Sequence, residues 1–99
     1  MTNLDVTTAK LRLHDGNEIP QVGLGVWQAA QGATTRDAVA AAIRLGYRHI
    51  DTAKIYGNEA DVGAAVRHAG VPRSELFVTT KLWNDDHGYD NALRAFDAS

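Results

Sequence analysis

The chain has 99 residues, 44% of them hydrophobic and 22% charged, which is ordinary for one small soluble domain with a real core. Its ten basic residues are scattered and its formal net charge is -2, so neither nucleic acid nor a membrane surface is an expected partner. It contains no cysteine, which excludes disulfides, thiolate nucleophiles and cysteine-based zinc sites.

The start of the chain shows no targeting signal. Residues 1–5 lack the positive charge and the apolar core of a signal peptide, and no apolar run approaches the roughly 18 residues of a membrane span. We therefore expect a cytoplasmic protein.

A β-hairpin is the first predicted element. Residues 10–13 alternate polar and apolar side chains, residues 15–17 (Asp-Gly-Asn) are a strong turn signal, and residues 18–22 resume the extended pattern. We assign residues 1–22 to an N-terminal tail and hairpin, and residues 23–99 to the units that follow.

A strand, a helix and a second strand come next. Residues 24–27 are a short apolar strand, and a helix is expected near Thr34, where Asp37 three residues later resembles a capping box. Gly46 tolerates the positive φ that commonly ends a helix, and residues 47–51 are the next strand.

The pattern then repeats. An apolar helical stripe over residues 62–69 ends at Gly70, Pro72 blocks its continuation, and residues 76–80 are rich in β-forming side chains. A third helix is expected to begin near Tyr89 or Asp90, with an apolar face of Ala92, Leu93 and Phe96. The alternation predicts an α/β fold with parallel strands.

Chemically useful side chains follow two of these strands. Asp51 and Lys81 are thirty positions apart, close to one βαβ unit, so both should lie at the carboxyl ends of adjacent parallel strands. A tyrosine hydroxyl, with an ordinary pKa of about 10, donates its proton poorly near neutral pH unless a cation stabilises the phenolate. Lys81 supplies that cation for Tyr56, and Asp51 anchors it; a purely structural Lys and Asp pair is the alternative.

The same rim carries candidates for a substrate pocket. Trp27 and Trp83 each follow a strand end, and either forms a pocket wall or fills the core. His87 lies in the loop after Lys81 and is the one histidine placed on this rim, whereas His49 is expected to be a satisfied core histidine. No histidine pair has helical metal-ligand spacing, so no metal is expected.

Two glycine-containing segments favour structural roles. Residues 23–25 (Gly-Leu-Gly) lack the third glycine and the helix of a dinucleotide fingerprint, so close backbone approach is the better explanation. Gly57 is expected to turn the chain into the next helix, with Asn58 as its cap.

These motifs resemble those of the aldo-keto reductases. The resemblance rests on Gly-Tyr-Arg-His-Ile-Asp-Thr-Ala-x-x-Tyr-Gly-Asn-Glu at residues 46–59 and on Thr-Lys-Leu-Trp at residues 80–83. It includes residues 23–27 and 86–89 and spans nearly the whole chain. The last segment is similar to the bacterial 2,5-diketo-D-gluconate reductase-like branch.

The resemblance implies a truncated (β/α)8 barrel, made of the hairpin across its base and the first three βα units. It also implies reduction of aldehydes or ketones to alcohols with NADPH as hydride donor. Tyr56 is then the acid, Lys81 its activator, and Asp51 both the partner of Lys81 and a neighbour of the nicotinamide ribose. The residues implied to border the cofactor and substrate are Gly25, Val26 and Trp27.

In the family, the catalytic histidine and the basic segment that grips the adenosine 2′-phosphate lie further along than Ser99, and His87 is not that histidine. We therefore expect the 99 residues alone to be inactive, and to self-associate or to require the remaining part of the barrel. A non-catalytic folding or assembly fragment is the alternative. A potassium-channel accessory subunit is disfavoured by the bacterial-type loops.

Overall fold

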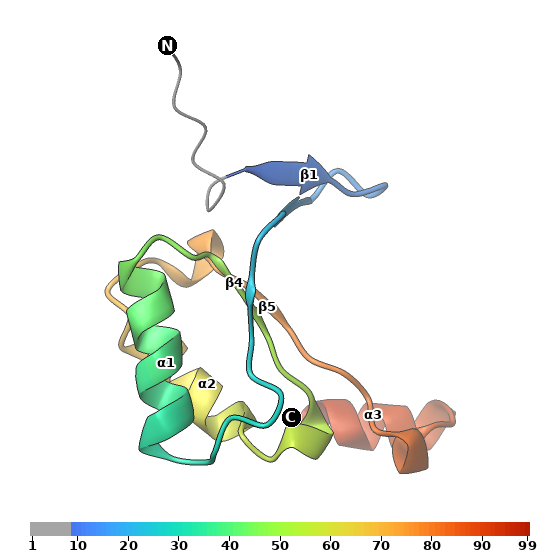
Figure 1. Ribbon diagram of the computed structural model, residues 1–99. Helices are drawn as coiled ribbons and strands as arrows, with labels where there is room; N and C mark the ends of the chain where they lie inside the picture. The colour runs from blue at the N-terminus through green and yellow to red at the C-terminus, as the bar shows by residue number, and fades with distance from the viewer. Residues whose placement is uncertain (1–8) are drawn as a thin grey trace.

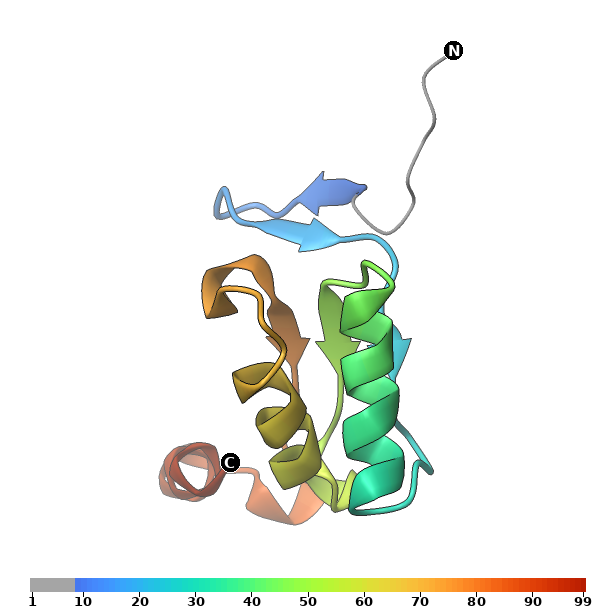
Figure 2. The same ribbon diagram turned by 90° about the vertical axis from the view of Figure 1, so that its left-hand side faces the viewer.

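The computed structural model describes residues 9–99, beginning with the predicted hairpin. Strands β1 (Lys10–Arg12) and β2 (Glu18–Pro20) pair antiparallel, with Leu11 opposite Ile19. The hairpin lies across the amino ends of the strands that follow (Figure 2). Residues 1–8, which belong to the tail assigned from the sequence, lie outside the described residues.

A three-stranded parallel sheet follows the hairpin, as predicted. Its strands are β3 (Leu24–Gly25), β4 (His49–Asp51) and β5 (Phe77–Thr79), in the order β3-β4-β5. In the register of the sheet, Asp51 lies opposite Gly25 on one side and Thr79 on the other. The three carboxyl ends therefore meet at one edge of the sheet.

Two helices cover one face of this sheet, and the third lies apart from them (Figures 1 and 2). These are α1 (Ala33–Arg44) and α2 (Glu59–Arg67), whereas α3 (Tyr89–Ala98) follows β5. Short 3-10 turns, η1 (Lys54–Tyr56), η2 (Arg73–Glu75) and η3 (Asn84–Asp86), complete the connections. The predicted order of elements is confirmed, with strands a few residues shorter than expected.

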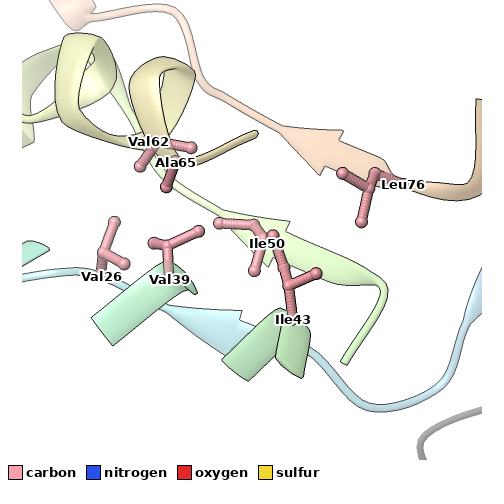
Figure 3. Close-up of a cluster of buried hydrophobic side chains, with 7 residues drawn as sticks. All are labelled: Val26, Val39, Ile43, Ile50, Val62, Ala65 and Leu76. Carbon is pink, nitrogen blue, oxygen red and sulfur yellow. The ribbon is translucent and has the colours of Figure 1, made fainter. Parts of the chain in front are cut away.

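The core lies between the sheet and the two covering helices (Figure 3). Ile50, in the middle of β4, is fully buried against them. Since side chains alternate along a strand, His49 and Asp51 point to the opposite, helix-free face. The remaining members of the buried cluster are Val26, Val39, Ile43, Val62, Ala65 and Leu76.

The predicted capping of α1 is wrong. The helix begins at Ala33 with Gly32 at the N-cap, so Thr34 lies inside it, and no local side chain caps it. Instead, the Gly32 N–H donates to Oδ2 of Asp61, a residue of the neighbouring helix α2, at 2.9 Å. A carboxylate from a neighbouring helix supplies what the local sequence pattern was expected to supply.

The apolar face predicted for α3 is not buried within residues 9–99. Leu93 is 52% exposed and Phe96 is 79% exposed, while Ala95 is the buried residue of this helix.

None of the described helices is long and apolar enough to cross a membrane.

The close backbone approach predicted for residues 23–25 is confirmed at Gly23. A Cβ built there would lie 2.9 Å from both the His49 carbonyl oxygen and its imidazole Cγ, while one built on Gly25 would meet nothing within 4 Å. The imidazole itself is held by Thr79 Oγ1 at 3.1 Å and by the Pro20 carbonyl at 3.3 Å. His49 is therefore hydrogen-bonded as expected, but it is half-buried on the helix-free face and is not the core residue that had been predicted.

This difference between two neighbouring glycines predicts their response to substitution. Gly23→Ala should lower the free energy of unfolding by about 1–3 kcal/mol, because the new methyl overlaps the backbone of β4. The matched control, Gly25→Ala, should change it by less than about 0.5 kcal/mol. Denaturant titration measures both values, and equal losses at the two positions would contradict the assigned contact.

Candidate functional site

The loops at the carboxyl edge of the sheet bring together the predicted proton donor and the two residues predicted to support it. Asp51 ends β4, Tyr56 ends η1, and Lys81 follows β5. Lys81 Nζ donates to Asp51 Oδ2 at 2.6 Å and to the Thr52 carbonyl at 3.0 Å. The same nitrogen lies 5.3 Å from the centroid of the Tyr56 ring. The ammonium thus sits between a carboxylate and a phenol ring.

The surroundings of Lys81 hold it in its charged form. Its hydrogen bond to Asp51 is the main cause that raises the pKa of the ammonium above the ordinary lysine value, against a smaller opposing effect of burial. The Tyr56 side chain contributes in the same direction. The two charged side chains are 47% and 35% exposed, so solvent screens the pair and its contribution to stability is modest.

A hollow of about 210 Å³ opens beside this group. Tyr56, Lys81 and Trp83 share its wall, which places an indole beside the phenol and the ammonium. The rest of the lining is Ala53, Ile55, Leu82 and Asn84. Mostly apolar walls with a few convergent polar groups are typical of small-molecule sites.

A larger hollow of about 430 Å³ lies between the Lys81 loop and α3, with Leu82, Ala95 and Phe96 in its wall. It does not include Tyr56 or Trp83. We therefore place the chemistry in the smaller hollow, where the titratable groups converge.

Two predicted pocket residues lie outside the wall of the smaller hollow. Trp27, just after β3, is 70% exposed, and His87, just after η3, is also exposed. Neither belongs to the residues that line it. Their assignment to the substrate pocket stays a prediction. Among residues 9–99, no three histidine, aspartate or glutamate side chains are grouped to hold a metal ion.

The residues predicted to border a cofactor lie beside Asp51. Gly25 is its neighbour in the sheet, and the backbone there is open on the side where a Cβ would stand. Val26 donates its N–H to the Asp51 carbonyl at 3.1 Å and is 2% exposed, with its side chain in the core. Only the backbone of Val26 therefore faces the rim.

A buried polar pair joins the loops behind the site, and the sequence analysis missed its role. Asn58 occupies the N-cap position of α2 as predicted, but its side chain makes no capping hydrogen bond. Its Oδ1 accepts from Thr52 Oγ1 at 2.8 Å, and its Nδ2 donates to the carbonyls of Val26 at 3.0 Å and Ala29 at 3.3 Å. Both polar side chains are buried. Thr52 directly follows the core strand β4 and Asn58 directly precedes α2, and these positions are the signal that could have revealed them.

A second set of contacts joins η1, which carries Tyr56, to η3, which follows Trp83. The Lys54 N–H donates to the Lys81 carbonyl at 3.3 Å, and the Lys54 ammonium pairs with Asp86 of η3. Asp86 donates its own N–H to the Trp83 carbonyl at 3.0 Å. The hydrogen bond and the ion pair thus hold η1, with Tyr56, next to η3 and the preceding Trp83.

Comparison with known proteins shows close relatives. Residues 21–99 match the family model described as the aldo/keto reductase family. An aldo-keto reductase of Mycolicibacterium smegmatis is 60% identical over 90 residues, which cover 91% of this chain. The match spans 32% of that relative, so the chain corresponds to about a third of its length.

Solved structures agree with the sequence comparison. An aldo/keto reductase from Brucella melitensis superposes with a TM-score of 0.86 at 52% identity, covering 91% of this chain and 35% of the other. An aldo-keto reductase from Bombyx mori, solved in complex with NADP, gives 0.84 at 45% identity and covers 95% and 34%. Both identities are high enough to support more than a shared fold.

The hydrogen bond between Lys81 and Asp51 predicts a pH dependence at the alkaline end. Because the native pKa of Lys81 is raised above its unfolded value, the pair stabilises the fold fully below the ordinary lysine pKa of 10.5. This contribution is lost as the pH rises through the higher native pKa. Denaturant titrations from about pH 9 to about pH 12 should show that loss in the wild type and much less of it in Asp51→Asn.

The control for this prediction is Lys10→Gln, on the exposed strand β1, which should keep the alkaline loss of the wild type. Nitrogen NMR of the Lys81 ammonium measures the cause directly. Its titration should move to lower pH in Asp51→Asn, and an unchanged titration would refute the role assigned to the carboxylate.

Proposed function

Because the chain belongs to the aldo/keto reductase family, we propose that it contributes the proton-donating part of an NADPH-dependent reductase of aldehydes and ketones. The observation that carries this proposal is the placement of the Lys81 ammonium, 2.6 Å from Asp51 and 5.3 Å from the centre of the Tyr56 ring. A phenol beside a fixed cation suits proton donation to an oxygen that becomes negative.

We propose that the nicotinamide end of such a cofactor lies at the rim beside Gly25 and Asp51. The backbone at Gly25 is open, so a flat ring can approach the sheet edge beside Asp51, which offers a carboxylate to a ribose hydroxyl. The relative from Bombyx mori, solved with NADP, supports the choice of cofactor. We assign Gly25, Val26 and Asp51 to this contact. When bound, NADPH supplies the hydride that reduces the carbonyl carbon.

The residues of this chain then handle the proton. Tyr56 donates its phenolic proton to the carbonyl oxygen as negative charge develops there, and Lys81 stabilises the phenolate that remains. Asp51 and the Thr52 carbonyl hold the ammonium in place. Trp83 forms one apolar wall for the substrate beside Tyr56. We place Trp27 and His87 on the outer part of the same substrate pocket.

The sheet suits the beginning of a (β/α)8 barrel. Its helix-free face carries His49, Asp51, Phe77 and Thr79, in the register that a barrel interior would require. Within residues 9–99, β3 and β5 each have one unpaired edge, which further strands of a barrel would cover. We propose that the described elements are the hairpin and the first three βα units of such a barrel.

The role of Tyr56 is tested by removing one oxygen atom. In a complete reductase barrel that contains these residues, here called the intact protein, Tyr56→Phe should lower kcat for an aldehyde such as benzaldehyde by about a hundredfold or more, because the proton donor is lost. NADPH binding, followed by fluorescence, should persist. Tyr89→Phe, a matched change on α3 where the side chain is 83% exposed, should leave kcat unchanged. Full activity in Tyr56→Phe would overturn the assignment.

The 99 residues alone provide a second test, which separates catalysis from a purely assembling role. Because two sheet edges and one face are open, we expect this chain to sediment as an associated species. Mixed with the remaining segment of the Mycolicibacterium smegmatis relative, it should form a one-to-one complex that oxidises NADPH with an aldehyde.

The same mixture made with Tyr56→Phe should be inactive, which attributes the activity to this chain. A one-to-one complex without turnover would favour the non-catalytic assembly fragment. A stable, cooperative monomer would contradict the expected association.

A further inference from the structure

The turn that displays Trp27 has an unusual backbone. The Ala29 N–H donates to the Val26 carbonyl at 3.0 Å, which closes a turn over Val26–Ala29. Gln28, its third residue, has a φ of 64°, and no other non-glycine residue between positions 9 and 99 has a positive φ. This is the pattern of a type II turn, in which glycine usually occupies that position. The turn is therefore costly for the residue that forms it.

Asn58 is placed to hold this turn in shape. Its Nδ2 donates to the carbonyls at both ends of the turn, Val26 at 3.0 Å and Ala29 at 3.3 Å. Its Oδ1 accepts from Thr52 Oγ1, which orients the amide, and the whole side chain is 0% exposed. A strained backbone persists where surrounding groups hold it in place. The buried Asn58 amide holds this turn through the two hydrogen bonds that it donates.

The rest of the loop is fixed to the same corner of the fold. The side chain of Gln31 lies against Gly57, where an added Cβ would come within 2.6 Å of its Nε2. The Gly32 N–H donates to Asp61 of α2. The loop is thus held from Val26 to Gly32 by the start of α2, while the Trp27 side chain at its tip is 70% exposed.

We propose that Asn58 is a positioning residue for the substrate pocket, which keeps the strained Val26–Ala29 turn closed and thereby fixes Trp27 at the rim of the site. The inference rests on the proposed function in one respect, that Trp27 borders the substrate. Trp27 is 70% exposed and does not belong to the buried core, so the orientation of its indole depends on the turn that carries it. Asn58 acts through Trp27 and touches no reacting atom.

The first test observes Trp27 in the intact protein without using activity. With 5-fluorotryptophan incorporated, the fluorine resonance of residue 27 is assigned by its loss in Trp27→Phe. Asn58→Ala should shift and broaden this resonance, because the turn opens once both carbonyls lose their donor. Ile43→Val, a core truncation outside the turn, should leave it in place. An unchanged resonance in Asn58→Ala, or an equal shift in Ile43→Val, overturns the proposal.

A second substitution at Gln28 provides a rescue. In the double variant Asn58→Ala with Gln28→Gly, the turn no longer carries the cost of a positive φ and should close again without the amide. The fluorine resonance should return toward its wild-type position and width. No recovery would show that the strained backbone is not what Asn58 restrains, and would overturn the proposal.

Kinetics in the intact enzyme connect the turn with substrate binding. Asn58→Ala should raise KM for the aldehyde about tenfold while kcat changes by less than about threefold, the pattern expected when a binding wall moves and the proton donor stays. The double variant should regain most of the lost affinity. If kcat falls and KM stays constant, Asn58 does not act through the substrate wall.

Two further outcomes are distinguishable. If Asn58→Ala does not fold, Thr52→Val carries the same test, because it removes only the hydroxyl that orients the amide, and a smaller shift of the Trp27 resonance is expected. If Tyr56→Phe retains activity, the proposed function fails, yet the fluorine experiment still decides whether Asn58 positions Trp27.

Discussion

The parallel register of β3, β4 and β5 is the constraint on which the rest of this structure depends. Ile50 must face the helices because it is fully buried between them and the sheet. Alternation along the strand then directs Asp51 to the helix-free face, at the edge where β5 delivers Lys81. A slip of one residue would bury the carboxylate and expose the isoleucine. The burial of Ile50 thereby fixes the position of Asp51 next to Lys81.

Hydrogen bonds between loops turn that edge into a defined site. Beyond the strand ends the ladder of the sheet stops, so the carbonyls of Val26, Ala29 and Thr52 accept hydrogen bonds from side chains instead. Asn58 satisfies two carbonyls of the β3 loop, and Lys81 satisfies the Thr52 carbonyl while it pairs with Asp51. The groups that complete the backbone hydrogen bonding are therefore the same ones that orient the functional side chains.

The sequence analysis succeeded where local pattern and strand geometry were sufficient. The hairpin, the alternating strands and helices, and the meeting of Asp51 with Lys81 followed from period, turn residues and the length of one βαβ unit. It failed in the capping hydrogen bonds of α1 and α2. Thr34 was expected to cap α1, but Asp61 from α2 provides that acceptor. Asn58 was expected to cap α2, but its amide joins two distant loops instead.

The sequence by itself determined the order of elements and the three residues that converge at the strand ends, because these depend on periodicity and chain length. Only the tertiary structure decided which polar side chains satisfy which backbone groups. The buried hydrogen bond between Asn58 and Val26 joins residues 32 positions apart, and no local pattern encodes that pairing. The strained turn at Gln28 belongs to the same class, because its φ is held by contacts that form only when α2 lies against the β3 loop.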